Sequence, residues 1–522
     1  MHIALARQLT LLSTIFHPSR PAVRMAAAKE EVDYLVVGAG ASGMAFVDTL
    51  FAHAPQPVSV LLVDEREQPG GHWNDAYDYA TLHQPARNYG VETVRLEEAA
   101  KSNSELRATK AEILDHYSAL LAGWQSKGHR VQFVGSASFD FEASAYTTKD
   151  GVRSAVPARK VVDARYTTND LPLHVPPRFK FDSERLDLIP PNELPARGAD
   201  AAQQRYCVLG AGKTGQDTML YLRETLGVAA EHILWVMPTA PWITRRDPPP
   251  GLKQNTCMEF LSVALEAHAA AGSPAGAAES AEFLQRGFEA LEAAGNIYKL
   301  DATRKPTKFM DATLNAREVD VLLGCAPSVV SGKGRVASIG DDGALNFADG
   351  STVALPWAAE GDGKGVEATT FVHCTTGAFN FGRSSAEAAR PVFAPDAIRV
   401  QEIFQFPGFC FNGAVIAWLE CQRGLSLDEK NRLCELPPPP AGPTTPPPLG
   451  PEAGDLGPMT ADHPLVRSHR NLRRWYATEG MGEWLHSLRL FSLTMNGYSL
   501  EEGRALIERN HNGLVATGVL AE

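Results

Sequence analysis

Residues 33–50 read DYLVVGAGASGMAFVDTL, which is an apolar run, a glycine-rich turn and a second apolar run. The first run predicts a short buried β-strand, and the second has the length of a helix. The turn carries the G-x-G-x-x-G pattern, in which Gly38 permits the tight turn, Gly40 lets the backbone approach a pyrophosphate and Gly43 lets helix and strand pack closely. The stretch therefore predicts a Rossmann unit whose helix N-terminus, including Ser42, faces an anion.

An acidic pair follows the next predicted strand. Residues 58–63 form an apolar run that ends on Asp64, with Glu65 beside it. In a dinucleotide-binding unit, an acid about 20 residues past the glycines accepts hydrogen bonds from the ribose hydroxyls. Asp64 and Glu65 are therefore expected to contact the cofactor. The alternative, a glycine-rich turn that binds nothing, is disfavoured because all the parts occur in order.

A second strand–turn–helix pattern starts at residue 205. The run RYCVL enters the turn Gly210-Ala-Gly212-Lys213-Thr214-Gly215, so the chain has room for two dinucleotides. The next strand, residues 233–236, is followed by Met237-Pro238 without an acid, and Arg245 and Arg246 come shortly after. Guanidinium groups suit a 2′-phosphate, so NADPH is favoured over NADH. The alternative is that both arginines lie on a solvated loop.

Six residues after Asp64 the chain reads Gly70-Gly71-His72-Trp73. In this spacing it resembles the two-dinucleotide-domain FAD/NAD(P)-binding oxidoreductases, including the class B flavin-containing monooxygenases. The motifs LHQP (82–85), DARY (163–166) and NRLC (431–434) extend the resemblance to a poorly characterised group of such oxidoreductases, over most of residues 32–434. The resemblance implies FAD, rather than NAD, at the first site, with the two glycines passing close to it.

The resemblance also implies roles for individual side chains. Those expected along the flavin ring are Tyr77, His83, Gln84, Arg87 and Tyr89. His83 would donate a hydrogen bond or a proton near the flavin, although a structural role is slightly favoured because most histidines are not catalytic. Lys213 would contact a phosphate of the second dinucleotide. Gly377, in the run TFVHCTTGAF (370–379), would end a buried strand at the domain junction.

These patterns predict an α/β fold with two Rossmann-like dinucleotide-binding domains and a helical C-terminal tail. The FAD-binding domain, residues 30–165 and 371–434, is expected to be discontinuous, with the NAD(P)-binding domain, residues 204–370, inserted in it. Residues 166–203 are expected to link the two domains, and the proline-dense stretch 435–460 predicts an extended spacer. Residues 461–522 recover helical periodicity, and their aromatic stripe is expected to pack in a core rather than to bind a cofactor.

Composition limits the classes of function. The 522 residues carry a formal net charge of −12, which disfavours nucleic acid or an anionic membrane as a partner and suits a small-molecule substrate. No apolar run reaches the length of a membrane-spanning helix. The seven cysteines include no C-x-x-C pair, so no metal site is predicted and a disulfide-reductase type of flavoenzyme is disfavoured. A reducing compartment is expected.

The first 29 residues are typical of an organellar leader. They contain Arg7, Arg20 and Arg24, several Ser and Thr residues and no acid. Such a composition predicts a transit peptide for the mitochondrion or the plastid. The alternative is a cytoplasmic protein with a disordered extension and translation from Met25.

Two coenzymes in one chain predict an oxidoreductase in which NAD(P)H reduces FAD. A monooxygenase-like enzyme acting on a small organic substrate is the first hypothesis. The class B fingerprint F-x-G-x-x-x-H-x-x-x-(F/Y) is absent from residues 166–186, which keeps a non-oxygenating flavin dehydrogenase or reductase open as an alternative. A non-catalytic FAD/NAD(P)H redox sensor is a further alternative.

Overall fold

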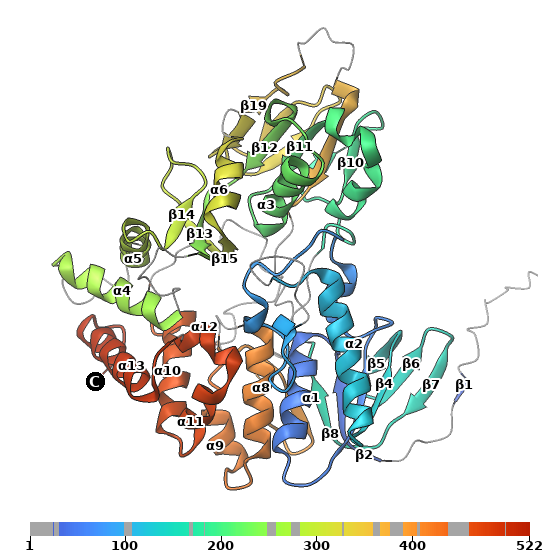
Figure 1. Ribbon diagram of the computed structural model, residues 1–522, viewed down its shortest axis with the longest axis vertical. Helices are drawn as coiled ribbons and strands as arrows, with labels where there is room; N and C mark the ends of the chain where they lie inside the picture. Colours follow the sequence, from blue (N-terminus) through green and yellow to red (C-terminus); the bar gives the residue numbers. More distant parts are fainter. Residues whose placement is uncertain are drawn as a thin grey trace, which may run out of the picture.

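The computed structural model describes residues 24–25, 31–98, 107–165, 171–181, 183–247, 257–272, 282–325, 328–358, 366–375, 390–404, 408–436, 459–495 and 497–521. Figure 1 shows two lobes. The blue, cyan, orange and red helices form one lobe, and most of the green and yellow elements form the other. Segments from the two ends of the sequence therefore lie together.

The first domain is built on a parallel sheet of five strands in the order β21-β8-β2-β3-β4. Its strands are β2 (Val32–Val37), β3 (Ser59–Val63), β4 (Arg130–Val134), β8 (Ala158–Asp163) and β21 (Ala397–Arg399). Strand β21 comes from sequence that follows the second domain. The predicted discontinuous first domain is therefore confirmed.

The two faces of this sheet are covered differently, because successive strand residues point to opposite sides. Tyr34 and Val36 pack in the cluster that contains the helices, whereas Leu35 and Val37 pack under a smaller sheet. The helices are α1 (Ala41–His53), α2 (Lys110–Ser126) and α8 (Gly408–Cys421), and α1 packs along α8. The smaller sheet has the order β1-β7-β6-β5, with β1 (Arg24–Met25), β5 (Ala137–Asp140), β6 (Ala145–Thr148) and β7 (Val152–Ala155).

The second domain repeats this plan. Its parallel sheet has the order β10-β20-β11-β12-β16, with β10 (Asp187–Ile189), β11 (Arg205–Leu209), β12 (Ile233–Met237), β16 (Val329–Ser331) and β20 (Thr369–His373). Helices α3 (Lys213–Leu220) and α6 (Ala316–Leu323) pack on one face. The other face is covered by the sheet of β9 (Lys180–Phe181), β17 (Val336–Ile339), β18 (Leu345–Phe347) and β19 (Thr352–Val353). Two Rossmann-like domains are therefore present, as the sequence predicts.

The segment expected to be a linker contributes to the second domain. Within residues 166–203, β10 is the edge strand beside β20, and β9 extends the covering sheet. Prolines surround these strands of two and three residues, so the local sequence predicts turns rather than a sheet. Their pairing depends on partners that lie far away in the sequence.

A third sheet and two helices are formed by residues that lie between β12 and β16 in the sequence. The sheet has the order β14-β13-β15, with β13 (Pro241–Arg245), β14 (Ile297–Lys299) and β15 (Lys308–Leu314). The helices are α4 (Cys257–Ala270) and α5 (Glu282–Ala293). Within the described residues, 3₁₀-helical segments are η1 (Gly71–Asp75), η2 (Ala86–Asn88), η3 (Leu96–Glu98), η4 (Pro191–Gln203, interrupted at Gly198), η6 (Ala230–His232), η9 (Val366–Ala368) and η10 (Arg489–Phe491), and η5 (Tyr221–Thr225) is π-helical.

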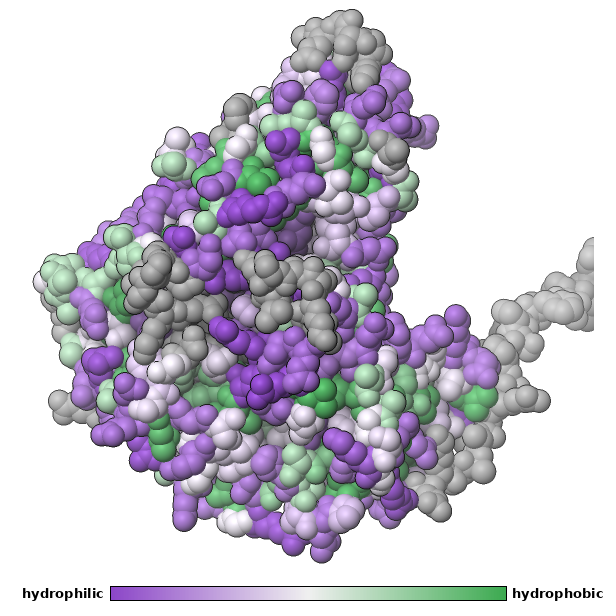
Figure 2. Space-filling view, viewed as in Figure 1, coloured by the Kyte–Doolittle hydropathy of each residue, from purple (hydrophilic) through white to green (hydrophobic). Residues whose placement is uncertain are grey.

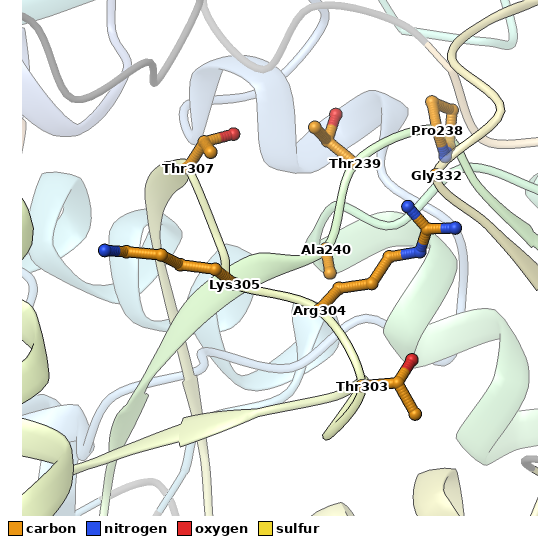
Figure 3. A pocket seen from close by; sticks show the side chains of 8 residues that line it. All are labelled: Pro238, Thr239, Ala240, Thr303, Arg304, Lys305, Thr307 and Gly332. Carbon is orange, nitrogen blue, oxygen red and sulfur yellow. The ribbon is translucent and has the colours of Figure 1, made fainter.

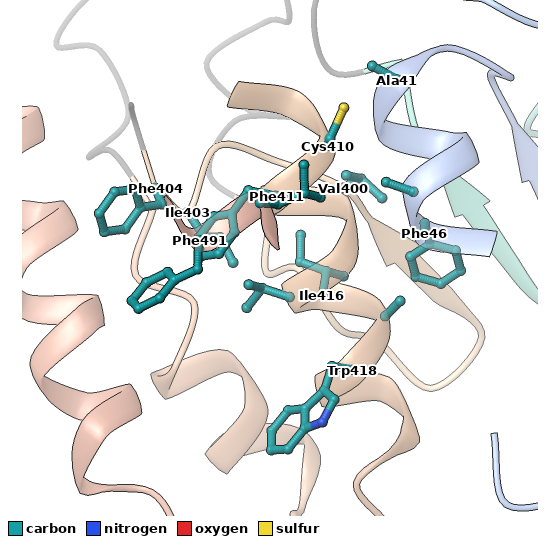
Figure 4. Packing of buried hydrophobic residues seen from close by; sticks show 14 of the residues in the cluster. Ala41, Phe46, Val400, Ile403, Phe404, Cys410, Phe411, Ile416, Trp418 and Phe491 are labelled. Carbon is teal, nitrogen blue, oxygen red and sulfur yellow. The ribbon is translucent and has the colours of Figure 1, made fainter. Parts of the chain in front are cut away.

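The C-terminal tail is helical and packs against the first domain and α4 (Figure 1). It contains α10 (Pro464–Ala477), α11 (Met481–Ser487), α12 (Ser492–Met495) and α13 (Leu500–Ala516), whereas α9 (Leu427–Arg432) follows α8 within the first domain. Phe411 of α8 lies close to Phe404 and Phe491 (Figure 4), at ring distances of 5.8 and 5.7 Å. Trp475 is fully buried in the same cluster, so the aromatic residues of the tail form core contacts.

Polar residues dominate the face of the molecule shown in Figure 2, where apolar residues occur in scattered patches. Among the described residues, no helix is both long enough and apolar enough to cross a membrane. Within the same residues, no group of three His, Cys, Asp or Glu side chains is arranged to hold a metal ion.

Replacing Gly43 by alanine tests the backbone packing at the first turn. A Cβ atom at Gly43 would lie 1.9 Å from the carbonyl oxygen of Gly38, so α1 would have to move away from the turn. We expect Gly43→Ala to lower the free energy of unfolding by about 1–3 kcal/mol, as overpacked sites do, in urea denaturation.

Gly123→Ala is the matched control, because an added Cβ in the helix α2 meets nothing within 4 Å. This change should raise the free energy of unfolding by roughly 0.5–1 kcal/mol. A Gly43→Ala protein as stable as the wild type would contradict the close approach at the turn.

Candidate functional site

The first glycine turn and the Gly70-Gly71 segment form one backbone-lined surface at the carboxyl end of β2. Gly38 and Gly71 adopt positive φ angles of 105° and 55°, which favour glycine. A Cβ atom at Gly71 would lie 2.8 Å from the Cα atom of Gly40, and the Gly70 N–H donates to the Ala39 carbonyl at 2.8 Å. The structure therefore brings these sequence-predicted residues together, with backbone rather than side chains between them.

Asp64 links this turn to the loop after β3. Its carboxylate accepts the Ala39 N–H at 2.6 Å on one oxygen and the Arg66 N–H at 2.8 Å on the other. Each carboxylate oxygen has a second lone pair, so Asp64 retains acceptor capacity for a ribose hydroxyl. Glu65 is exposed next to it, and Ser42 is buried in the first turn of α1.

Trp73 and Tyr89 form a buried pair beside the first turn. The Trp73 Nε1–H donates to the Tyr89 hydroxyl at 2.8 Å, and burial raises the pKa of Tyr89. Burial, together with the nearby Arg66, lowers the pKa of His72 to about 4, so its ring is neutral at physiological pH. Gln84 is half-buried and Arg87 is exposed.

The second glycine turn has the same backbone geometry. Gly210 has a φ of 128°, and a Cβ atom at Gly215 would lie 2.2 Å from the Gly210 carbonyl oxygen. Gly212 is the N-cap of α3, and the next residues, Lys213 and Thr214, form its first turn. The Lys213 ammonium pairs with Asp217 one turn along the helix. The N-terminus of α3 therefore offers backbone N–H groups and a cation to an anion.

Arg245 and Arg246, expected at a 2′-phosphate, are engaged within the protein. Arg246 is ion-paired with Glu318 and donates to the carbonyls of His83 at 2.8 Å and Thr313 at 3.1 Å. Its side chain is only 3% exposed, so it does not lie on a solvated loop. Arg245 donates to the Asp247 carbonyl at 2.7 Å. Phosphate contact by either arginine stays a prediction.

A cavity at the carboxyl end of β12 contains basic residues that sequence reasoning missed. It has a volume of about 410 Å³ and is lined by Pro238, Thr239, Ala240, Thr303, Arg304, Lys305, Thr307 and Gly332 (Figure 3). The side chains of Arg304 and Lys305 are 50% and 60% exposed. They lie far from β12 in the sequence, so the only sequence signal was the adjacent pair of basic residues before β15.

Tyrosines of the first domain contact the helix that begins at the second glycine turn. The Tyr77 hydroxyl donates to Asp217 at 2.7 Å, and the Tyr79 hydroxyl lies 3.1 Å from that of Thr218. The Tyr79 ring also stacks on Tyr221 at 4.0 Å. Asp217 therefore joins Tyr77 of one domain to Lys213 of the other, and the two dinucleotide-binding units have a defined relative orientation.

His83 lies among cations at the same junction. Burial, followed by the charges of Lys213, Arg246 and Arg107, lowers the pKa of His83 to about 3. Arg107 also pairs with Glu318 at 3.2 Å. Near neutral pH the imidazole is uncharged, so it can donate a hydrogen bond, but it holds no second proton to give away. Its Nδ1 is buried without a hydrogen-bond partner among the described residues.

Several predicted features lie outside the described residues. These are Gly377, most of the leader and residues 437–458 of the proline-dense stretch. All seven cysteines are free thiols, and six of them are buried.

This geometry defines a class of protein, in which one chain carries two Rossmann-like dinucleotide-binding domains. Residues 36–100 match the family described as NAD(P)-binding Rossmann-like domain. The chain is 30% identical over 475 residues to the uncharacterized protein Rv2000 of Mycobacterium tuberculosis, covering 88% of this chain and 77% of that protein. The uncharacterized protein Mb2023 of Mycobacterium bovis gives the same values. The chain belongs to the same family as these mycobacterial proteins.

Solved structures of two monooxygenases are more distant. The open crystal structure of cyclohexanone monooxygenase aligns with a TM-score of 0.47 and 16% identity, over 75% of this chain and 87% of that chain. Oxidized steroid monooxygenase bound to NADP aligns with a TM-score of 0.46 and 15% identity, over 75% and 84%.

The low pKa of His83 predicts a pH dependence of stability. The unfolded chain takes up a proton at His83 below its ordinary pKa of 6.5, whereas the folded chain does not until about pH 3. The stability that the folded protein gains from a neutral His83 is therefore fully present above pH 6.5, and the free energy of unfolding falls by that amount as the pH falls toward 3.

In the wild type, the free energy of unfolding should fall when the pH is lowered from about 7.5 to about 5.5. In His83→Gln this fall should be smaller by roughly 1 kcal/mol, measured by denaturant titration. An unchanged pH dependence would show that the ring is not desolvated in the folded protein.

Proposed function

We propose that the chain is an FAD-dependent oxidoreductase that takes reducing equivalents from NADPH. The observation that carries this proposal is the presence of two glycine-opened helix N-termini, those of α1 and α3, each at the carboxyl end of a central parallel strand. Such N-termini bind phosphate groups through unpaired N–H groups and the helix dipole. The contact between Tyr77 and Asp217 holds the two units together, as transfer between two coenzymes requires.

The first site suits FAD. Gly71 approaches Gly40 so closely that no side chain fits between them, so a dinucleotide lying along this surface would meet backbone there. Asp64 is placed to accept from the ribose, while Trp73 and Tyr89 supply a buried aromatic wall. When bound, flavin would accept hydride from the nicotinamide. The resemblance in the Gly70–Trp73 segment supports the same choice.

The second site suits NADPH. The ribose of a dinucleotide lies beside the carboxyl end of the second strand of a Rossmann unit, and there the cavity after β12 offers Arg304 and Lys305 instead of an acid. Arg304 extends toward Pro238 and Gly332 (Figure 3). The Arg304 guanidinium suits a 2′-phosphate, while the Lys305 ammonium, which pairs with Glu289 at 2.7 Å, adds positive charge at the rim of the cavity. Lys213 at the first turn of α3 is placed for the pyrophosphate.

We further propose a monooxygenase-like reaction on a small organic substrate. The resemblance to class B flavin monooxygenases supports it, as does the state of the cysteines, which are all free thiols. Burial raises the pKa of all seven, among them Cys207 and Cys434, and a protonated buried thiol is a poor nucleophile. The flavin is therefore expected to pass its electrons to oxygen and not to a protein thiol pair.

The spectrum of the purified protein tests the two-cofactor assignment. It should show the visible absorbance of bound flavin, and NADPH should bleach that absorbance without oxygen. Gly215→Ala should retain the flavin but slow bleaching by roughly 10- to 100-fold, because an added Cβ displaces the second turn. Colourless protein that cannot take up FAD, or bleaching unaffected by Gly215→Ala, would contradict the assignment.

A separate measurement in air tests the monooxygenase reaction. A compound that lowers the amount of peroxide released per NADPH oxidised would be identified as a monooxygenase substrate.

Coenzyme preference tests the role of the cavity after β12. The double variant Arg304→Gln/Lys305→Gln should raise the Kd for NADPH by about tenfold or more, because charge-assisted hydrogen bonds to the phosphate are lost. The Kd for NADH, which lacks this phosphate, should not change. Arg317→Gln, on the exposed surface of α6, is the control. Equal loss of both coenzymes would place the 2′-phosphate elsewhere.

A further inference from the structure

The side chain of Arg489 joins the C-terminal tail to the loop of residues 87–92, which lies beside the proposed first dinucleotide site. Arg489 begins the turn η10, between α11 and α12. Its guanidinium donates to three backbone carbonyls of one loop, namely those of Arg87, Tyr89 at 3.1 Å and Val91 at 2.5 Å. Its side chain is 14% exposed and lies 3.7 Å from the Glu97 carboxylate. These donors therefore satisfy carbonyls that have limited access to water.

Further hydrogen bonds join the same loop to the tail. The Glu92 carboxylate accepts the N–H groups of Arg489 at 3.0 Å and Leu490 at 2.8 Å, and the Ser492 hydroxyl donates to the Asn88 side chain at 2.7 Å. In all of these hydrogen bonds residues 489–492 of the tail are the donors and residues 87–92 are the acceptors. This set of hydrogen bonds fixes the position of the loop relative to the tail more tightly than apolar contact alone.

The loop held by Arg489 carries a residue of the first site. Tyr89 accepts the indole N–H of Trp73, and Trp73 belongs to the turn that starts at Gly71. Gly71 in turn packs against Gly40 of the phosphate-binding turn. A continuous series of contacts therefore leads from the tail to the surface proposed to bind FAD.

The far end of the loop is anchored independently. The N–H of Thr93 donates to Asp48 of α1 at 3.1 Å, and the Trp124 indole approaches the same carboxylate at 3.4 Å. Loss of the Arg489 side chain would consequently remove the donors to the carbonyls of Arg87, Tyr89 and Val91 while leaving Thr93 attached. The expected disturbance is local to Tyr89 and its partner Trp73.

We propose that Arg489 is a positioning residue for the first dinucleotide site, and that the C-terminal tail is part of the structure that sets its affinity for FAD. This inference rests on the proposed function, in which FAD occupies the first site. Arginine suits the role because its planar group presents five N–H donors in a fixed fork, which a lysine ammonium does not reproduce.

The test compares Arg489→Gln with Arg473→Gln in the full-length chain. Arg473 lies on the tail surface, where it pairs with Glu508 and is 45% exposed. Each flavin-depleted protein is titrated with FAD, followed by flavin fluorescence, and separately with NADPH. We expect Arg489→Gln to raise the Kd for FAD about tenfold, which is the effect of losing hydrogen bonds from a charged donor, with the Kd for NADPH unchanged. Arg473→Gln should change neither.

Two further variants keep the proposal falsifiable. Arg489→Lys should recover only part of the FAD affinity, and combining Arg489→Gln with Trp73→Phe should cost less than the two separate effects together, because both act through Tyr89. If Arg489→Gln does not fold, Glu92→Gln replaces it and should show the same selective loss of FAD affinity. Unchanged FAD affinity, or equal loss of FAD and NADPH, would overturn the role of Arg489. A wild-type chain that binds no FAD would instead refute the proposed function.

Discussion

The contact between the backbone of Gly43 and the carbonyl of Gly38 determines how the first domain is built. Because no side chain separates them, α1 starts directly above the end of β2, and its N-terminus opens at the edge of the sheet. The same contact recurs between Gly215 and Gly210. In both places the residue that follows the neighbouring strand packs against the turn. This residue is Ala164, after β8, in the first domain and Cys374, after β20, in the second. The positions of the two helix N-termini, at which the proposed function places anions, therefore follow from backbone packing and do not depend on a charged side chain.

The junction between the domains is polar, in contrast to the apolar cores on either side. Tyr77, Tyr79 and His83 of the first domain meet α3 and Arg246 of the second, and the ion pair of Arg246 with Glu318 lies behind them. Buried ion pairs of this kind contribute little net stability, but they penalise any arrangement that leaves one charge alone. The junction thus favours one orientation of the domains over others of similar packing.

The two Rossmann units and the discontinuous first domain could be predicted from the sequence, because short contiguous motifs specify them. The spacing of Gly38, Gly40 and Gly43, the acid at Asp64 and the repeat at Gly210 were sufficient for two Rossmann units, and the return of apolar runs near residue 400 was sufficient for a discontinuous first domain. Strands β9 and β10 were missed because they are short and depend on distant partners. Arg304, Lys305 and Arg489 were missed for a related reason, since each approaches its site only through tertiary packing. The buried state of Arg246 depends on Glu318, which no pattern near Arg246 indicates.

The discontinuity of the first domain affects how the chain is made. Helix α1 is almost entirely buried, and much of its cover is α8, which the ribosome adds only after the whole inserted domain. Until then, a growing chain presents an unpaired apolar helix and the open edge of β8, where β21 will later pair. Exposed surfaces of this kind make partly synthesised proteins prone to aggregation. Completion of the first domain is thus a late event in biosynthesis, because its central helix is covered only after the inserted domain has been made.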